Sequence, residues 1–267
     1  MAIIALDRVS KTYSSQAGET AALLDVSLAV DQGEFVSLIG PSGCGKSTLL
    51  RIVADLVPLS TGTVTVNGKA PEAARLDRDY GIVFQAPVLY DWRTVEANVG
   101  LPLEVIGRPR AERDERVRGL LRLVGLEAFR RHYPWQLSGG MQQRVAIARA
   151  LVTNPAILLM DEPFGALDEM TRERLNGELL NVCRETGATV LFVTHSIAEA
   201  VFLSSRVVVL SPRPGRIERV VEVDLPQPRG EKTRALPRFF ELVTLVRERL
   251  AEDPALAAGA GPVGGVR

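Results

Sequence analysis

The sequence predicts an α/β fold that carries an inserted helical region and an antiparallel β edge. Three observations lead to this prediction. Short apolar runs of strand length alternate with segments of helical periodicity. The strand pattern disappears from Thr94 to Leu151 and then returns. The alternating run Gly62–Val66 ends at Asn67-Gly68, a dipeptide typical of hairpin turns.

These patterns predict the individual elements. Expected strands are Phe35–Ile39, Gly62–Val66, Tyr80–Phe84, Ile157–Met160, Thr189–Val193 and Arg206–Leu210. Expected helices are Lys46–Leu56, Val95–Val105, Ala111–Val124, Gly139–Leu151, Glu169–Thr186 and Leu236–Glu252. The first helix should end before Pro58, since proline disfavours helical backbone in the residue before it. Asp168 is expected to cap the fifth helix and Gly187 to end it.

The order of these elements predicts the domain organisation. Residues 1–93 and 152–224 are expected to form the α/β core, and residues 94–151 the helical subdomain inserted into it. Residues 225–254 are expected to form a proline-broken linker and a final helix. Residues 255–267 are rich in Ala and Gly and are expected to be disordered.

Composition excludes several classes of protein. Lys plus Arg and Asp plus Glu both number 32, and this zero net charge argues against a nucleic-acid partner. The two cysteines form no disulfide framework, which fits a reducing compartment. No secretory signal is visible, and no apolar run reaches the ~20 residues of a membrane span. We expect any work at a membrane to be done from its surface, through partners.

A glycine-rich stretch joins the first expected strand to the first expected helix. Its pattern of glycine, four residues, glycine, lysine and serine is that of a phosphate loop. Glycines let successive N–H groups curl around phosphate oxygens, and the helix N-terminus adds positive potential. Lys46 is expected to contact the β- and γ-phosphates and Ser47 to bind Mg²⁺. The residues expected to bind the nucleotide here are Gly40, Pro41, Ser42, Gly43, Cys44, Gly45, Lys46, Ser47 and Thr48.

Two carboxylates follow the apolar strand Ile157–Met160. Strands of open α/β sheets present ligand-binding groups at their carboxyl ends. Asp161 can hold Mg²⁺ through water, and Glu162 can orient or deprotonate an attacking water. The alternative is a solvated strand end, which the phosphate loop upstream disfavours.

A third motif gives the chain a specific resemblance. Leu137-Ser138-Gly139-Gly140-Met141, followed by Gln142-Gln143-Arg144, resembles the signature motif of the ATP-binding subunits of ABC transporters. Met141 stands where glutamine is commoner in that family. The resemblance implies a P-loop NTPase core of the ABC ATPase type. It also implies that the helix beginning at Gly139 faces the γ-phosphate held by a second copy of the chain.

Other positions match the family one at a time. Tyr13 resembles the aromatic residue that stacks on adenine, with a half-buried strand tyrosine as the alternative. Gln85 resembles the Q-loop glutamine, which touches Mg²⁺ and links the two lobes. Gly165-Ala166-Leu167-Asp168 resembles the D-loop, with Gly165 where serine is frequent. His195 resembles the switch histidine that contacts the γ-phosphate.

The resemblance implies a site shared by a homodimer, with ATP and Mg²⁺ between two copies. Glu162 would act as general base, with His195, Lys46 and Gln85 as the other catalytic residues. The implied metal ligands are Ser47, Gln85 and Asp161, and the partner copy would contribute Ser138, Gly139 and Gly140. Cys44, beside a lysine and a helix N-terminus, is expected to react with thiol reagents unless ATP protects it. The alternative is that Cys44 is a small spacer.

The segments Gln85–Val95 and Val208–Arg216 resemble the group of nitrate, sulfonate and taurine importers, which also includes pyrimidine and vitamin importers. This resemblance implies transmembrane permease subunits, a periplasmic or lipid-anchored solute-binding protein, and a peripheral place on the cytoplasmic face of the membrane. Tyr90, Trp92 and Arg93 are expected to line the groove that docks a permease helix. An ABC exporter and a soluble ABC ATPase remain as alternatives.

Overall fold

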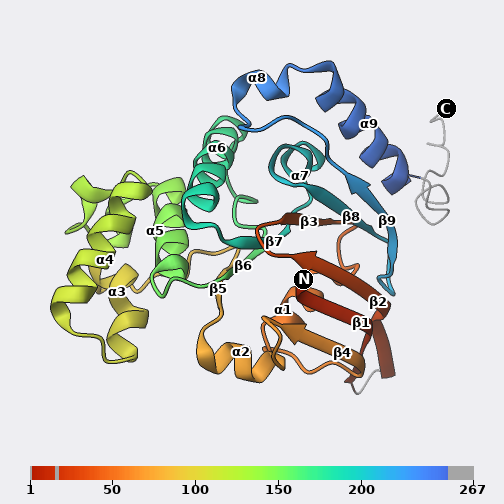
Figure 1. Ribbon diagram of the computed structural model, residues 1–267, viewed down its shortest axis with the longest axis horizontal. Helices are drawn as coiled ribbons and strands as arrows, with labels where there is room; N and C mark the ends of the chain where they lie inside the picture. Colours follow the sequence, from red (N-terminus) through yellow and green to blue (C-terminus); the bar gives the residue numbers. More distant parts are fainter. Residues whose placement is uncertain (1, 16–17, 252–267) are drawn as a thin grey trace, which may run out of the picture.

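The computed structural model describes residues 2–15 and 18–251, which fold around two β-sheets (Figure 1). The smaller sheet is antiparallel, with the order β2-β1-β4, and the larger has the order β5-β6-β7-β3-β8-β9. Within the larger sheet only the β8–β9 pair is antiparallel. The strands are β1 (Ala2–Ser15), β2 (Gly18–Asp31), β3 (Phe35–Ile39), β4 (Thr61–Val66), β5 (Tyr80–Val83), β6 (Ile157–Asp161), β7 (Thr189–Val193), β8 (Arg206–Leu210) and β9 (Ile217–Glu222).

Helices lie on the larger sheet and beside it. Figure 1 shows α3, α4 and α5 gathered at the left, and α8 and α9 at the top. The α-helices are α1 (Lys46–Val53), α2 (Pro71–Asp77), α3 (Val95–Val105), α4 (Arg110–Leu123), α5 (Gly139–Leu151), α6 (Glu169–Thr186), α7 (Ile197–Leu203), α8 (Glu231–Arg234) and α9 (Pro237–Ala251). Two short 3₁₀ helices, η1 (Glu127–Phe129) and η2 (Pro134–Gln136), precede α5.

The parallel strands are buried on both faces because each face has its own apolar core. In β7, Val190 and Phe192 pack with α5, α6, α7 and α9, whereas Leu191 and Val193 pack with α1 and the smaller sheet. A strand covered on both sides needs apolar residues at every position, which is why these strands appear as continuous apolar runs. The core on the α5 side is continuous with the interior of the helical region.

Sheet topology decides where the polar loops meet. The strands β3, β6 and β7 are parallel neighbours, so the loops that follow them emerge at the same edge. These loops carry the glycine-rich stretch after Ile39, the carboxylates at the end of β6, and His195. Residues far apart in sequence are thereby brought to one place.

Several elements differ from the sequence-based expectation. The helix α1 ends at Val53 rather than Leu56, because Asp55 adopts a left-handed backbone with φ 49°. Asn67-Gly68 does form a tight turn, but α2 follows it instead of a second long strand. The elements β1, β2, α2, α7, α8 and β9 were not individually predicted. The expected disorder of residues 255–267 lies outside the described residues.

Candidate functional site

The glycine-rich loop is closed around the ammonium group of Lys46. Lys46 Nζ donates hydrogen bonds to the backbone oxygens of Gly40 at 2.8 Å and Pro41 at 2.9 Å. The side chain is 6% exposed, so these carbonyls replace the water that the charge would otherwise bind. A phosphate that enters the loop therefore meets a positive charge that is already held at the position the motif requires.

Glycine is required at Gly45 by both backbone and space. Its φ of 106° is one that other residues rarely adopt, and a Cβ would lie 2.6 Å from Leu23 Cδ2. The β2 strand thus packs directly against the start of α1. The helix N-terminus stays open to an anion because no side chain covers it there.

The burial of Cys44 was not expected from the sequence. Its side chain points into the loop and is 1% exposed, and Sγ lies 3.7 Å from Lys46 Nζ. A reactive cysteine needs access for the reagent as well as a favourable charge environment. The prediction of a reactive thiol overlooked this burial, and the structure favours the alternative of a small buried spacer.

Ser47 and Asp161 meet although they are 114 residues apart. Ser47 Oγ donates to Asp161 Oδ1 at 2.7 Å, and Arg51 Nη2 lies 3.9 Å from Asp161 Oδ2. The hydroxyl and the carboxylate are hard oxygen ligands, the kind that Mg²⁺ takes up through one or two protein groups. The pair fits such an ion beside the phosphate loop.

Glu162 and His195 also lie side by side. His195 Nδ1 is 3.2 Å from Glu162 Oε2, and the histidine ring is largely exposed. Glu162 has φ 47°, an uncommon backbone conformation for a residue with a side chain. Gln85 comes from the end of β5 to the same place, since Gln85 Nε2 and Glu162 Oε2 lie 3.5 and 3.6 Å from the Cβ position that Gly165 lacks.

A cavity of about 350 Å³ opens over the phosphate loop. Tyr13 forms one wall, and its hydroxyl lies 3.5 Å from Thr48 Oγ1. The ring is 41% exposed, so it is free to stack on a planar group. The residues lining the cavity are Tyr13, Thr20, Ala22, Ser42, Gly43, Gly45, Lys46, Ser47, Thr48, Glu162 and Arg213.

The chain is similar to known proteins of one family. Residues 23–165 match the family described as ABC transporter. The chain is 50% identical over 224 residues to an uncharacterised ABC transporter ATP-binding protein of Methanocaldococcus jannaschii, covering 84% of this chain and 83% of the relative. It is 45% identical over 264 residues to the taurine import ATP-binding protein TauB of Rhizobium johnstonii, covering 97% of this chain and 100% of the relative.

The chain belongs to the ABC transporter family. It is also 41% identical over 240 residues to the aliphatic sulfonates import ATP-binding protein SsuB of Bacillus cereus, covering 90% of this chain and 94% of the relative. A dimeric, post-hydrolysis ATP-binding cassette bound to ADP and Pi has a TM-score of 0.73 and 39% identity, covering 82% of this chain and 98% of that structure. The predictions of an ABC ATPase fold, of ATP binding and of ATP hydrolysis are confirmed.

In this ABC ATPase the signature motif begins α5. Ser138 caps the helix by accepting a hydrogen bond from Met141 N at 3.3 Å. Ser138 and Gly139 are exposed, and Gly140 packs against Thr171 of α6. The cavity over the phosphate loop is lined by other residues of the same chain, so the structure does not bring the signature to it.

The signature helix is tied to the Q-loop by Gln143, which belongs to the signature stretch, and by Arg149, which the sequence analysis did not single out. Gln143 Nε2 donates to Phe84 O at 3.3 Å. Arg149 donates from Nη1 to Val88 O at 2.7 Å and from Nη2 to Pro87 O at 2.8 Å. For Arg149 the sequence signal was only an arginine at a half-buried position of α5.

Proposed function

We propose that the chain is the ATP-hydrolysing subunit of an ABC importer that takes up a small solute of the taurine and sulfonate type. The observation that carries the proposal is the phosphate loop and signature motif in one chain whose relatives are named as import ATP-binding proteins. These names favour import over export. They also favour sulfonates over the pyrimidine and vitamin solutes of the same group.

The site is completed by a second copy of the chain. Ser138, Gly139 and Gly140 are exposed or at a helix start, and they lie outside the cavity that holds Lys46 and Ser47. Two copies arranged head to tail place each signature against the other's phosphate loop. The similar cassette that is a dimer bound to ADP and Pi supports the formation of a dimer. ATP then joins the copies, and hydrolysis lets them part.

Within each copy the chemistry falls to Glu162. We assign it as general base, with His195 3.2 Å from it as the residue that contacts the γ-phosphate. Lys46 and Gln85 position and neutralise the phosphate chain, and Tyr13 stacks on the adenine. Ser47, Asp161 and Gln85 would hold Mg²⁺, which would supply further charge neutralisation at the phosphates.

The permease docks on the loop that follows the Q-loop. Tyr90 and Trp92 form an edge-to-face pair with centroids 5.0 Å apart, and Trp92 is 75% exposed. Exposed aromatic residues on an ordered loop suit an interface anchor. The loop is ordered by buried Asn98, which accepts from Tyr90 N at 2.8 Å and donates to Arg93 O at 3.0 Å.

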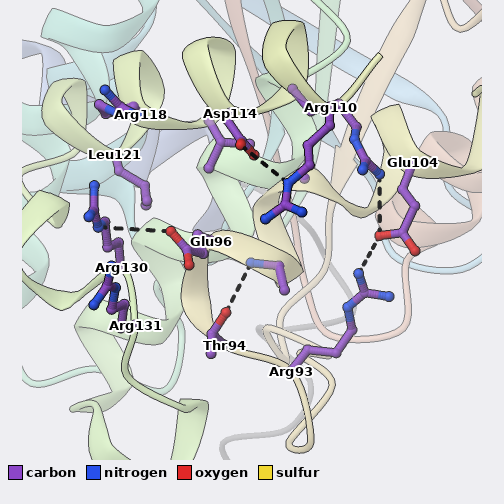
Figure 2. Close-up of a pocket in the computed structure, with 14 residues that line it drawn as sticks. Arg93, Thr94, Glu96, Glu104, Arg110, Asp114, Arg118, Leu121, Arg130 and Arg131 are labelled. Carbon is purple, nitrogen blue, oxygen red and sulfur yellow. Dashed lines mark hydrogen bonds and ion pairs between the residues drawn. The ribbon is translucent and has the colours of Figure 1, made fainter. Parts of the chain in front are cut away.

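An arginine-rich cavity of about 410 Å³ borders this loop between α3 and α4 (Figure 2). Its three carboxylates are already engaged; Glu104, for example, pairs with both Arg93 and Arg113. Arg118 and Arg131 make no ion pair with any other residue that the structure describes. The cavity therefore favours a docking segment that carries carboxylates.

The remaining proposals concern place and organisation. No helix in residues 2–15 and 18–251 is long and apolar enough to cross a membrane. We place the subunit at the cytoplasmic face, held by permease subunits that a periplasmic or lipid-anchored solute-binding protein loads. Residues 94–151 form the helical signature subdomain, and residues 1–93 with 152–224 form the nucleotide-binding core, which carries the docking loop.

Replacing Glu162 by glutamine tests this function. Glu162→Gln is expected to bind ATP normally, to lose turnover by about 10²–10⁴-fold, and to accumulate as an ATP-bound dimer. Steady-state ATPase rates and size-exclusion chromatography with ATP measure both effects. An unchanged kcat would overturn the assignment of the general base.

A further inference from the structure

We propose that Arg213 is a nucleotide-binding residue that, together with Lys46, contacts the phosphate chain of ATP. The inference rests on the proposed function of the cavity over the phosphate loop. Arg213 lines that cavity although it follows β8, far from each nucleotide motif in the sequence. Arg213 belongs to the segment Val208–Arg216 that resembles the importer group, but that resemblance assigns it no role, and no ion pair with a described residue accounts for it.

The guanidinium lies directly over Gly43. Arg213 Nε donates to Gly43 O at 3.3 Å, and Nη2 lies 3.2 Å from the Cβ position that Gly43 lacks. Any larger residue at 43 would press on the guanidinium, and the φ of 75° also favours glycine there. The glycine thus makes room for the arginine as well as for phosphate.

The loop that carries Arg213 is held by backbone hydrogen bonds to β2 and by hydrogen bonds within itself. Gly215 N donates to Ala22 O at 2.9 Å, and Leu24 N donates to Gly215 O at 3.0 Å. Ser211 Oγ donates to Pro214 O at 3.1 Å and accepts from Arg216 N at 2.9 Å. The backbone of such a loop is already ordered, so binding through Arg213 has only the side chain left to order.

The charge of Arg213 has no counterion among the described residues. The hydrogen bond from Nε goes to the neutral carbonyl of Gly43, which leaves the other guanidinium donors for a ligand in the cavity. Arginine binds phosphate oxygens through paired N–H groups, and this is the strongest use of such donors. The ligand chemistry is therefore a nucleoside di- or triphosphate.

The test compares Arg213→Ala, Arg213→Gln and Arg213→Lys with Arg216→Ala, a matched control on the same loop that does not line the cavity. Equilibrium titrations with fluorescent ATP and ADP are expected to show about tenfold weaker binding of both by Arg213→Ala and Arg213→Gln. Arg213→Lys and Arg216→Ala should stay within a few-fold of wild type. In Arg213→Ala and Arg213→Gln the KM for ATP should rise while kcat is kept.

Arg213→Gln distinguishes the loss of the positive charge from the loss of the hydrogen bond to Gly43, because glutamine can still donate to Gly43 O but carries no charge. Affinity within twofold of wild type in Arg213→Ala and Arg213→Gln would overturn the proposal. So would unchanged nucleotide affinity with loss of ATP-driven dimerisation, which would make Arg213 an interface residue. Lys46→Ala is measured in parallel: if it also binds ATP like wild type, the proposed nucleotide site itself is wrong.

Discussion

Replacing Gly215 by alanine should damage the ATP site without touching any motif residue. A Cβ at position 215 would lie 2.0 Å from Cys44 O, whereas real Cβ contacts stay above 3.0 Å. One of the two loops must therefore move by about 1 Å or more. The phosphate loop binds through backbone groups, so a shift of Cys44 displaces the atoms that bind the nucleotide.

The loss of folding stability in Gly215→Ala can be worked out from the contacts of Gly215. Overpacking costs about 1–3 kcal/mol. The backbone bonds between Gly215 and residues 22 and 24 contribute about 1 kcal/mol each and are weakened by the same movement. A total of about 2–5 kcal/mol lowers the melting temperature by roughly 5–20 °C in a domain of this size. A displacement of about 1 Å at the phosphate loop should reduce kcat/KM about 10²-fold.

Thermal unfolding and steady-state ATPase kinetics measure these effects. Gly177→Ala is the matched control, because Gly177 lies within α6 with no atom within 4 Å of its added Cβ. Alanine there should stabilise the protein by about 0.5–1 kcal/mol and leave kcat/KM unchanged. If Gly215→Ala melts and hydrolyses ATP like wild type, the inferred packing of the two loops is wrong.

Two further predictions concern docking and pH. Trp92→Ala should reduce copurification with the permease, and coupled transport, by about tenfold or more, as expected for an interface anchor. Phe240→Ala, which removes another exposed aromatic residue, is the control and should reduce neither. Intact transport in Trp92→Ala would exclude docking at this loop. Burial raises the pKa of the Glu199 carboxyl, outweighing the hydrogen bond from Thr194 and the electrostatic influence of Arg172, which both lower it. The folded state therefore favours the protonated carboxyl. The stability that this preference contributes is complete below the unfolded-state pKa of Glu199 and is lost as pH rises through its folded-state pKa. Glu199→Gln should therefore gain melting temperature over wild type at pH 8 and lose that gain at pH 4, and a gain independent of pH would refute this.

Local periodicity was enough to predict the bounds of the elements whose pattern of buried residues is regular. The expected bounds of α3, α5, α6, β7 and β8 agree with the structure. The long strand β1 was missed because its register shifts break the alternation that marks a strand, and β2 alternates cleanly only over residues 26–31. The helix α7 was missed because its last five residues are all buried, which leaves no polar face to reveal its period.

The same contrast applies to the site. The sequence by itself is enough to predict a phosphate site at Gly40–Ser47, because such a site uses consecutive backbone groups of one loop. Only the tertiary structure decided that Asp161 meets Ser47, that Cys44 is shut inside the loop, and that Arg213 lies over Gly43. Those contacts depend on β6 and β8 lying close to β3 in the sheet, an order that hydrogen bonding between distant strands sets and local sequence does not encode.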